Sequence, residues 1–177
     1  NMETRLEDEN GNPIDHTDTP GEICGRGPHA MLMYFKDPEK TEYVMRNDWF
    51  HSGDIGTYDE DGYISVVDRM KDMVKTGGEN VASREVEEAI YQDNRVEEVA
   101  VIGAPHPKWM EAVVAVVVPK KGEQIQEEEI INQCREILAP FKTPKHVIIA
   151  DYLPKTPTGK ILKKDLRDNY KEIFTQD

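Results

Sequence analysis

Lys160 is the residue of this chain best suited to take part in a reaction, because its neighbours would hold its ammonium group at a set place. It ends the run Pro154-Lys155-Thr156-Pro157-Thr158-Gly159-Lys160, which precedes a basic, helix-like segment. Prolines fix φ and reduce the freedom of a loop, and glycine permits a turn that a side chain would block. A fixed cation stabilises negative charge that develops on phosphate and carboxylate oxygens. On this motif alone, a solvent-facing lysine before a helix is an equal alternative.

Two further residues have side chains suited to a nucleotide. Asp54 ends the run Trp49-Phe50-His51-Ser52-Gly53-Asp54 and precedes an apolar strand. Its carboxylate can accept hydrogen bonds from two adjacent hydroxyls, as on a ribose. The planar fork of Arg69 suits a ribose hydroxyl or a phosphate oxygen. Taken singly, a turn aspartate and a surface arginine are the simpler interpretations.

A glycine pair forms the third motif, Lys75-Thr76-Gly77-Gly78-Glu79-Asn80. Paired glycines let a ligand approach the backbone closely, although a tight strand-to-helix turn explains them equally well. The segment around Gly159 is not a phosphate-binding P-loop, because Pro154 stands in place of its first glycine and Ile161 in place of its serine or threonine.

Composition excludes several classes of function. The 177 residues carry a net charge of −13, which argues against a nucleic acid or an anionic membrane as partner. Two cysteines far apart indicate a reducing compartment. The longest apolar run, 112–118, is too short for a membrane span, and the polar start shows no signal peptide. We therefore expect a cytoplasmic protein. The histidines lack ligand spacing, so no metal site is expected.

The first part of the chain, residues 1–68, predicts short strands joined by turns. Asp37 is a candidate N-cap for a short helix with Pro38 in its first position. Asp59-Glu60-Asp61-Gly62 is expected to close a hairpin rather than to bind calcium, because Thr57 replaces the first aspartate of a calcium loop. The strands are expected at 21–25, 31–35, 55–58 and 63–68.

The second part, residues 73–177, predicts alternating strands and helices. Ser83 is expected to cap a helix that runs to about 92. The stretch 112–119 is apolar almost throughout, which is typical of a strand buried on both faces. Further strands are expected at 73–76, 96–103 and 146–150, and further helices at 127–138 and 161–174. The fold class is α+β: a β-rich segment, then a small mixed α/β domain with a central sheet and flanking helices. The charged segment 69–72 between them is suited to a hinge.

In order and spacing, these motifs resemble the C-terminal third of the adenylate-forming superfamily. The motifs are Trp-Phe-His-Ser-Gly-Asp, Asp-Arg-x-Lys-Asp, Gly-Gly-Glu-Asn-x-x-x-x-Glu-x-Glu and Pro-Lys-Thr-x-x-Gly-Lys, and the resemblance covers nearly the whole chain. The superfamily includes acyl-CoA synthetases, oxidative luciferases and adenylation domains of nonribosomal peptide synthetases. The runs 67–73 and 77–81 are most similar to medium- and long-chain fatty acyl-CoA synthetases.

The resemblance implies a two-step ligase that uses ATP, Mg²⁺ and coenzyme A. A carboxylate and ATP give an acyl-adenylate and pyrophosphate, and the acyl group then passes to the thiol of coenzyme A. The matching residues would be Asp54 and Arg69 at the nucleotide, Lys71 as the hinge of a mobile small domain, and Lys160 in adenylation. The loop with Lys75, Gly77 and Gly78 would face the site during thioester formation.

The resemblance also implies parts that this chain lacks, namely the family's phosphate loop and its magnesium motif. We therefore expect residues 1–68 to be the tail of a large domain, residues 73–177 to be the small domain, and the chain by itself to be inactive. Two alternatives stay open: an adenylate-forming enzyme whose acceptor is a carrier protein or oxygen, and a non-catalytic binding module that keeps the fold. Acyl chain length and oligomeric state do not follow from the sequence.

Overall fold

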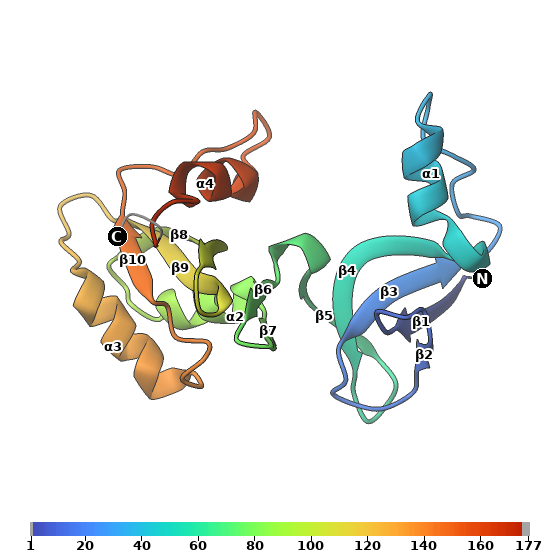
Figure 1. Cartoon of the computed structure of the whole chain (residues 1–177), viewed down its shortest axis with the longest axis horizontal. Coiled ribbons are helices and arrows are strands. Elements are labelled where there is room, and N and C mark those ends of the chain that lie inside the picture. Colours follow the sequence, from blue (N-terminus) through green and yellow to red (C-terminus); the bar gives the residue numbers. More distant parts are fainter. Residues whose placement is uncertain (1, 175–177) are drawn as a thin grey trace. The chain divides into compact units, whose positions relative to one another are not determined.

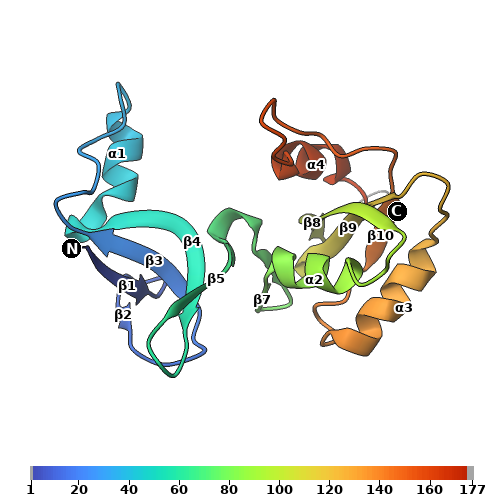
Figure 2. The same ribbon diagram turned by 180° about the vertical axis from the view of Figure 1, so that it is seen from behind.

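A computed structural model describes residues 2–174 of the chain (Figures 1 and 2). The chain divides into two compact units, Asn1–Lys71 and Asp72–Asp177, and each unit contains its own five-stranded sheet. Among the described residues, no helix has the length and apolar character needed to cross a membrane.

The first unit is built on an antiparallel sheet in the order β2-β1-β3-β4-β5. Asp59 closes the hairpin between the last two strands, since its Oδ1 accepts hydrogen bonds from the backbone N–H groups of Asp61 and Tyr63. The hairpin expected at this turn is confirmed. The strands are β1 (Glu3–Glu7), β2 (Pro13–Ile14), β3 (Gly21–Arg26), β4 (Phe50–Tyr58) and β5 (Ile64–Arg69).

Between β3 and β4 lie helix α1 (Pro38–Val44) and the 3-10 turn η1 (Arg46–Asp48). Asp37 caps α1 as expected, accepting a hydrogen bond of 3.0 Å from the N–H of Lys40. The strand expected at 31–35 is wrong. Its residues form no strand, and the side chains of Leu32 and Phe35 are 89% and 86% exposed. The backbone turns at residues 35–36, so this apolar stretch does not extend to meet a partner.

The second unit mixes strands and helices, as the sequence predicts. Strand β9 is central, pairing with β8 and β6 antiparallel and with β10 parallel. The elements are η2 (Met70–Asp72), which spans the boundary, then β6 (Val74–Thr76), β7 (Glu79–Val81), α2 (Ser83–Ile90), β8 (Val96–His106), β9 (Met110–Pro119), α3 (Glu127–Ile137), β10 (His146–Ile149) and α4 (Lys163–Tyr170).

Strand β9 is buried on both faces, which confirms the interpretation of its apolar sequence. Val113, Ala115 and Val117 join the cluster that also holds residues of α2 and α3. Val114 and Val116 alternate with them and join the cluster that holds Leu166 of α4. The sheet is therefore the middle of three layers, with α2 and α3 on one side and α4 on the other (Figures 1 and 2).

Two expected helix boundaries are wrong. Ser83 does not cap α2: Ala82 is the N-cap, and Ser83 is the first helical residue, fully buried. Helix α4 is shorter than the expected 161–174 and begins late, because the backbone of Leu162 is not helical (φ −91°, ψ 75°) and its N–H bonds to the carbonyl of Pro154 at 2.8 Å. The helix therefore begins only at Lys163, directly after the loop that carries Lys160.

Candidate functional site

Asp54 and Arg69 lie opposite each other on β4 and β5. The Nε atom of Arg69 is 3.4 Å from Oδ1 of Asp54, and the two side chains are 58% and 37% exposed. An accessible carboxylate beside a planar cation offers both acceptors and donors to one ligand. The sequence predicts both residues, but Asp54 lies inside β4 rather than before the strand.

A bulge in β4 presents Asp54. Glu22 pairs with Ile55 and Cys24 pairs with His51, so the three residues 52–54 lie opposite the single residue 23 of β3. Gly53 takes φ of +75° in this bulge, a conformation that favours glycine. The N–H of Asp54 is held by the Oγ atom of Ser52 at 3.0 Å. Bulges of this kind redirect side chains beside functional sites.

Lys160 is carried by a loop that closes on itself. The N–H of Thr156 bonds to the carbonyl of Lys160 at 2.8 Å, and the N–H of Lys160 bonds to Oγ1 of Thr156 at 3.1 Å. Gly159 turns the chain at φ of +84°, and Lys155 and Ile161 form an isolated β-bridge across the loop base. Lys160 itself is exposed. The fixed loop and accessible cation match what the sequence predicts.

Lys163 ties this loop to helix α2. Its Nζ atom lies 2.6 Å from Oγ of Ser83 and 2.7 Å from Oε1 of Glu87. The side chains of Lys163 and Glu87 are only 16% and 17% exposed. The same Glu87 oxygen accepts the N–H of Val101 on β8 at 2.8 Å. One lysine therefore joins α4, α2 and β8, and sequence reasoning missed it because its partners lie far away in the chain.

The glycine pair forms the tip of the β6–β7 hairpin rather than a strand-to-helix turn. Gly77 and Gly78 have φ of +61° and +89°, and Lys75 pairs with Asn80 across the strands. Positive φ at both central residues is typical of tight hairpin turns. The N–H of Lys75 is bonded by Oε2 of Glu111 at 2.8 Å, and its side chain is exposed.

An aromatic and cationic cluster lies next to this hairpin. The N–H of Gly77 bonds to the carbonyl of Trp109 at 3.0 Å. The Trp109 ring stacks on His106 with centroids 4.2 Å apart, and the Nζ atoms of Lys108 and Lys145 lie 5.6 and 5.5 Å from its centroid. Sequence reasoning missed this cluster, although a tryptophan beside a lysine in a polar turn is a signal for it.

The boundary between the two units falls between Lys71 and Asp72, inside η2. Asp72 belongs to the second unit, where its Oδ1 accepts a hydrogen bond of 3.0 Å from Nη1 of Arg167 on α4. Arg69, at the end of β5, belongs to the first unit. The segment 69–72, expected from the sequence to act as a hinge, thus contains residues of both units.

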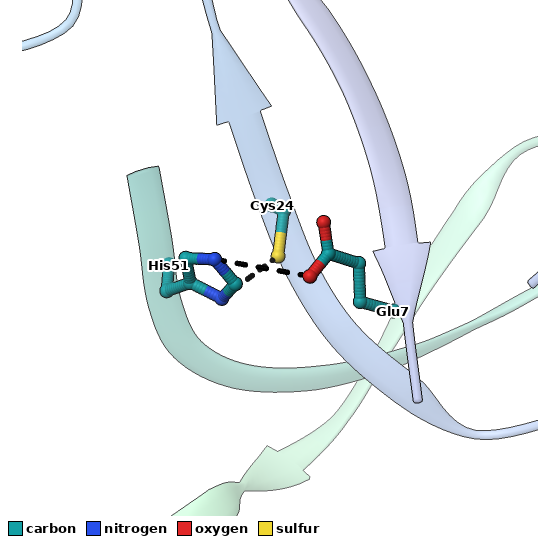
Figure 3. Close-up of side chains that lie close together, drawn as sticks. All are labelled: Glu7, Cys24 and His51. Atoms are coloured by element: carbon teal, nitrogen blue, oxygen red, sulfur yellow. Dashed lines mark hydrogen bonds and ion pairs between the residues drawn. The ribbon is translucent and has the colours of Figure 1, made fainter. Parts of the chain in front are cut away.

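Three buried side chains of types that bind metals lie together in the first unit. One donor atom from each of Glu7, Cys24 and His51 lies within 4.8 Å of the others, and the three side chains point toward one another (Figure 3). Two of their atoms, Oε2 of Glu7 and Nε2 of His51, are 3.8 Å apart and have no hydrogen-bond partner within residues 2–174. Sequence reasoning missed this cluster, because its three residues come from three different strands.

Burial keeps both cysteines in the thiol form. Burial raises the pKa of Cys24 to about 12, and the nearby carboxylates of Glu7 and Glu22 add to this effect. Burial alone raises the pKa of Cys134 to about 11. Neither thiol is therefore a nucleophile near neutral pH.

Comparison with known proteins identifies the family. Residues 85–160 match the family described as the AMP-binding enzyme C-terminal domain. A feruloyl-CoA synthase from Amycolatopsis sp is 46% identical over 168 residues, which make up 95% of this chain and 34% of that protein. The crystal structure of ATP-bound MatB from Rhodopseudomonas palustris matches with a TM-score of 0.90 and 40% identity, over 98% of this chain and 35% of that one. The chain belongs to the adenylate-forming superfamily.

The chain also resembles a long-chain-fatty-acid–CoA ligase from Escherichia coli O157:H7. The two are 42% identical over 166 residues, which make up 94% of the chain and 29% of that ligase. The chain thus spans about a third of the length of the curated relatives it matches. The superfamily and the mixed α/β fold that the motifs predict are confirmed. The roles expected for Asp54, Arg69, Lys71, Lys160 and the glycine hairpin stay predictions.

Proposed function

We propose that this chain is the nucleotide- and thiol-handling part of an ATP-dependent acid–CoA ligase. In the first step, a carboxylate oxygen of the acid bonds to the α-phosphorus of ATP, and pyrophosphate leaves. In the second step, the sulfur of coenzyme A bonds to the acyl carbon, AMP leaves and the thiol proton is lost. The observation that carries the proposal is the exposed Asp54–Arg69 pair in a chain whose relatives are CoA ligases.

Asp54 and Arg69 would bind the nucleotide. The carboxylate of Asp54 would accept the ribose hydroxyls, and Arg69, whose Nε lies 3.4 Å from it, would hold the carboxylate in place and donate to the nucleotide. One carboxylate already paired with an arginine does not supply the several oxygen ligands that Mg²⁺ needs. The ion would therefore enter with the ATP phosphates.

Lys160 would serve the first step. The acid and the α-phosphate are both anionic, and a lysine offsets their repulsion and the charge that gathers on the transferring group. Losing one well-placed donor in such a site typically costs about 10²–10³ in rate. The closed loop 154–162 supports this role, because it fixes the backbone position from which the lysine side chain extends.

The glycine hairpin would serve the second step. Gly77 and Gly78 present bare backbone at a turn, beside which the slender thiol arm of coenzyme A could pass. The adjacent Trp109 ring and the lysines over it suit the flat base and the phosphates at the other end of that molecule. Lys71 lies next to the boundary between the units and would be the hinge. Rotation about it would replace the Lys160 loop at the reaction site by the glycine hairpin between the two steps.

The acid is proposed to be a fatty acid, as the runs 67–73 and 77–81 indicate. The relatives named above act on either ferulate or long-chain fatty acids by their names, so an aromatic acid is the direct competitor. Because the chain spans about a third of these relatives, we expect it to make no acyl-adenylate by itself. Cytoplasmic location is likewise part of the proposal.

The test separates the two steps in the protein as its gene encodes it. Lys160→Ala should lower acid-dependent exchange of pyrophosphate into ATP by about 10²–10³, while transfer from a synthetic acyl-adenylate to coenzyme A stays near the wild-type rate. Lys164→Ala, a neighbouring exposed lysine on α4, is the matched control. Equal loss of both steps would refute the role of Lys160, and no acid-dependent exchange in the wild type would refute the ligase.

A further inference from the structure

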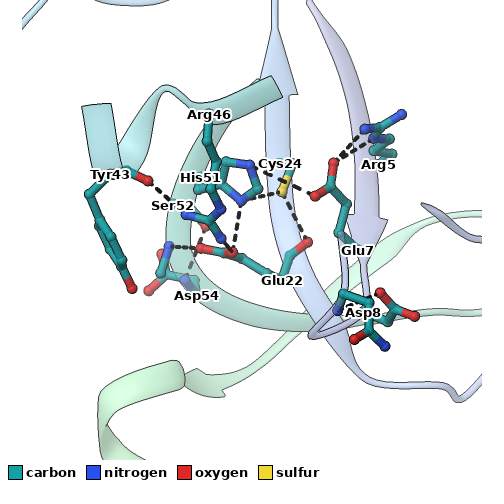
Figure 4. Close-up of polar contacts among 12 residues, drawn as sticks. Arg5, Glu7, Asp8, Glu22, Cys24, Tyr43, Arg46, His51, Ser52 and Asp54 are labelled. Carbon is teal, nitrogen blue, oxygen red and sulfur yellow. Dashed lines mark hydrogen bonds and ion pairs between the residues drawn. The ribbon is translucent and has the colours of Figure 1, made fainter. Parts of the chain in front are cut away.

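Glu22 is a buried carboxylate that collects hydrogen bonds from three directions. It is 6% exposed. Its Oε2 atom lies 2.7 Å from Nη2 of Arg46 and 2.8 Å from Nδ1 of His51, and its Oε1 atom accepts the N–H of Gly53 at 3.0 Å (Figure 4). These four residues are called the Glu22 network below. Buried carboxylates are costly unless such donors compensate their charge.

All three donors come from the chain segment that leads to Asp54. Arg46 belongs to η1, and His51 and Gly53 belong to β4, so the network attaches this segment to β3 where the register of the two strands shifts. In the bulge, the N–H of Gly53 points to a side chain instead of a neighbouring strand. The Glu22 side chain therefore accepts the backbone hydrogen bond that the bulge removes from the pairing of β3 and β4, one residue before Asp54.

We propose that Glu22 and His51 are positioning residues that fix the Gly53–Asp54 bulge and thereby set the direction of the Asp54 carboxylate. The inference rests on the proposed role of Asp54 at the nucleotide. Neither residue would touch the substrate. Their loss would weaken binding of ATP more than binding of the acid, since only the nucleotide meets Asp54.

Hydrogen bonds also account for the cysteine beside the network, which a metal ion would otherwise explain. Sγ of Cys24 lies 3.5 Å from the carbonyl of Glu22, to which its S–H can donate, and 3.2 Å from Nδ1 of His51. We therefore treat the cluster as a hydrogen-bonded core, with metal content as part of the test.

Glu7 provides a matched control. It is as buried as Glu22, at 2% exposed, and its Oε2 atom faces the other nitrogen of the same histidine at 3.8 Å. Its hydrogen bonds, however, come from Arg5 on its own strand at 2.5 and 2.8 Å. Glu7→Gln should therefore alter the same core without loosening Gly53.

The histidine offers a second matched pair. Asparagine can place its amide nitrogen near the position of Nδ1, whereas glutamine places its amide nearer to Nε2. His51→Asn should keep the contact with Glu22, and His51→Gln should lose it. A merely structural role for His51 would make the two variants equally harmful.

The experiment measures the KM values for ATP and for the acid in the protein as its gene encodes it. Glu22→Gln and His51→Gln should each raise the KM for ATP about tenfold and leave the KM for the acid within twofold. His51→Asn and Glu7→Gln should stay within about threefold of wild type for both substrates. An equal rise in Glu7→Gln, or equal values for the two His51 variants, would overturn the proposal.

Hydrogen–deuterium exchange separates failure of this inference from failure of the ligase, because it needs no activity. The peptide that covers residues 52–56 should exchange faster in Glu22→Gln than in wild type and Glu7→Gln. Unchanged exchange there would overturn the positioning role, even if the enzyme is a ligase. Stoichiometric zinc in the purified protein that is lost in Cys24→Ser would also overturn it, because the network would then be a metal site.

Discussion

Replacing Lys163 by methionine should destabilise the second unit far more than its position on a helix surface suggests. The side chain bridges Ser83 and Glu87 at 2.6 and 2.7 Å and is 16% exposed. An exposed ion pair is worth about 0.2–1 kcal/mol, and breaking a fully buried pair costs about 3–5 kcal/mol. Because Lys163 and Glu87 lie between these limits, we expect a loss of about 2 kcal/mol. Methionine keeps the apolar stem of the side chain, so the loss in free energy of unfolding measures the contribution of the ammonium group.

Thermal unfolding in a Trp49→Phe background measures this loss. The chain has two tryptophans, and with Trp49 of the first unit removed, fluorescence reports Trp109 of the second unit. A loss of about 2 kcal/mol should lower the midpoint by roughly 10 °C. The control Lys164→Met, at an exposed position of the same helix, should stay within about 0.5 kcal/mol of wild type.

A double-mutant cycle with Glu87→Gln shows whether the pair itself is responsible. If it is, the two variants should couple by at least about 1 kcal/mol, because the neutral double variant no longer buries an unpaired charge. The reasoning is refuted if Lys163→Met costs no more than Lys164→Met, or if the two effects simply add.

The pKa shifts lead to three further predictions. Because burial raises the pKa of Cys24 to about 12 and of Cys134 to about 11, a thiol reagent at pH 8 should label neither in the native chain and both after unfolding in urea. Fast labelling of the native chain at pH 8 would contradict this. The unfolded thiols ionise from about pH 9 upward while the folded ones stay neutral, so stability should fall as the pH rises above 9. The hydrogen bonds from Arg95 lower the pKa of Asp93, so the pair stabilises the fold above the ordinary carboxyl pKa of 3.8 and loses this effect as the pH falls through the lowered value. Urea unfolding should therefore show Asp93→Asn less stable than wild type at pH 7, with a difference that shrinks as the pH falls below 3.8. A difference that does not shrink with falling pH would contradict the assignment.

The sequence predicts those parts of the fold and site that depend on neighbouring residues. The Asp37 cap, the 59–62 turn and the closed loop before Lys160 are all built from groups a few residues apart. The double burial of β9 also follows from the sequence, because an unbroken apolar strand of this length must be covered on both faces. These features need no knowledge of the tertiary structure.

The sequence does not predict features that depend on distant partners. The stretch 31–35 is as apolar as a strand, but pairing decides whether it becomes one. Ser83 has the side chain of a helix cap, yet its hydroxyl contacts Lys163, eighty residues later. The Glu22 network has no motif either, because a hydrogen bond across 29 or 31 residues leaves no periodic trace in the chain.

The closed loop before α4 makes the place of residue 160 independent of its side chain. The groups that fix this loop are peptide N–H and C=O groups and the hydroxyl of Thr156, and the lysine ammonium is not among them. An arginine, a neutral alanine or an acylated lysine would therefore be presented from the same Cα position. The amount of charge delivered can then vary while the presenting loop stays the same, so affinity and reactivity can be adjusted here without an accompanying change in folding.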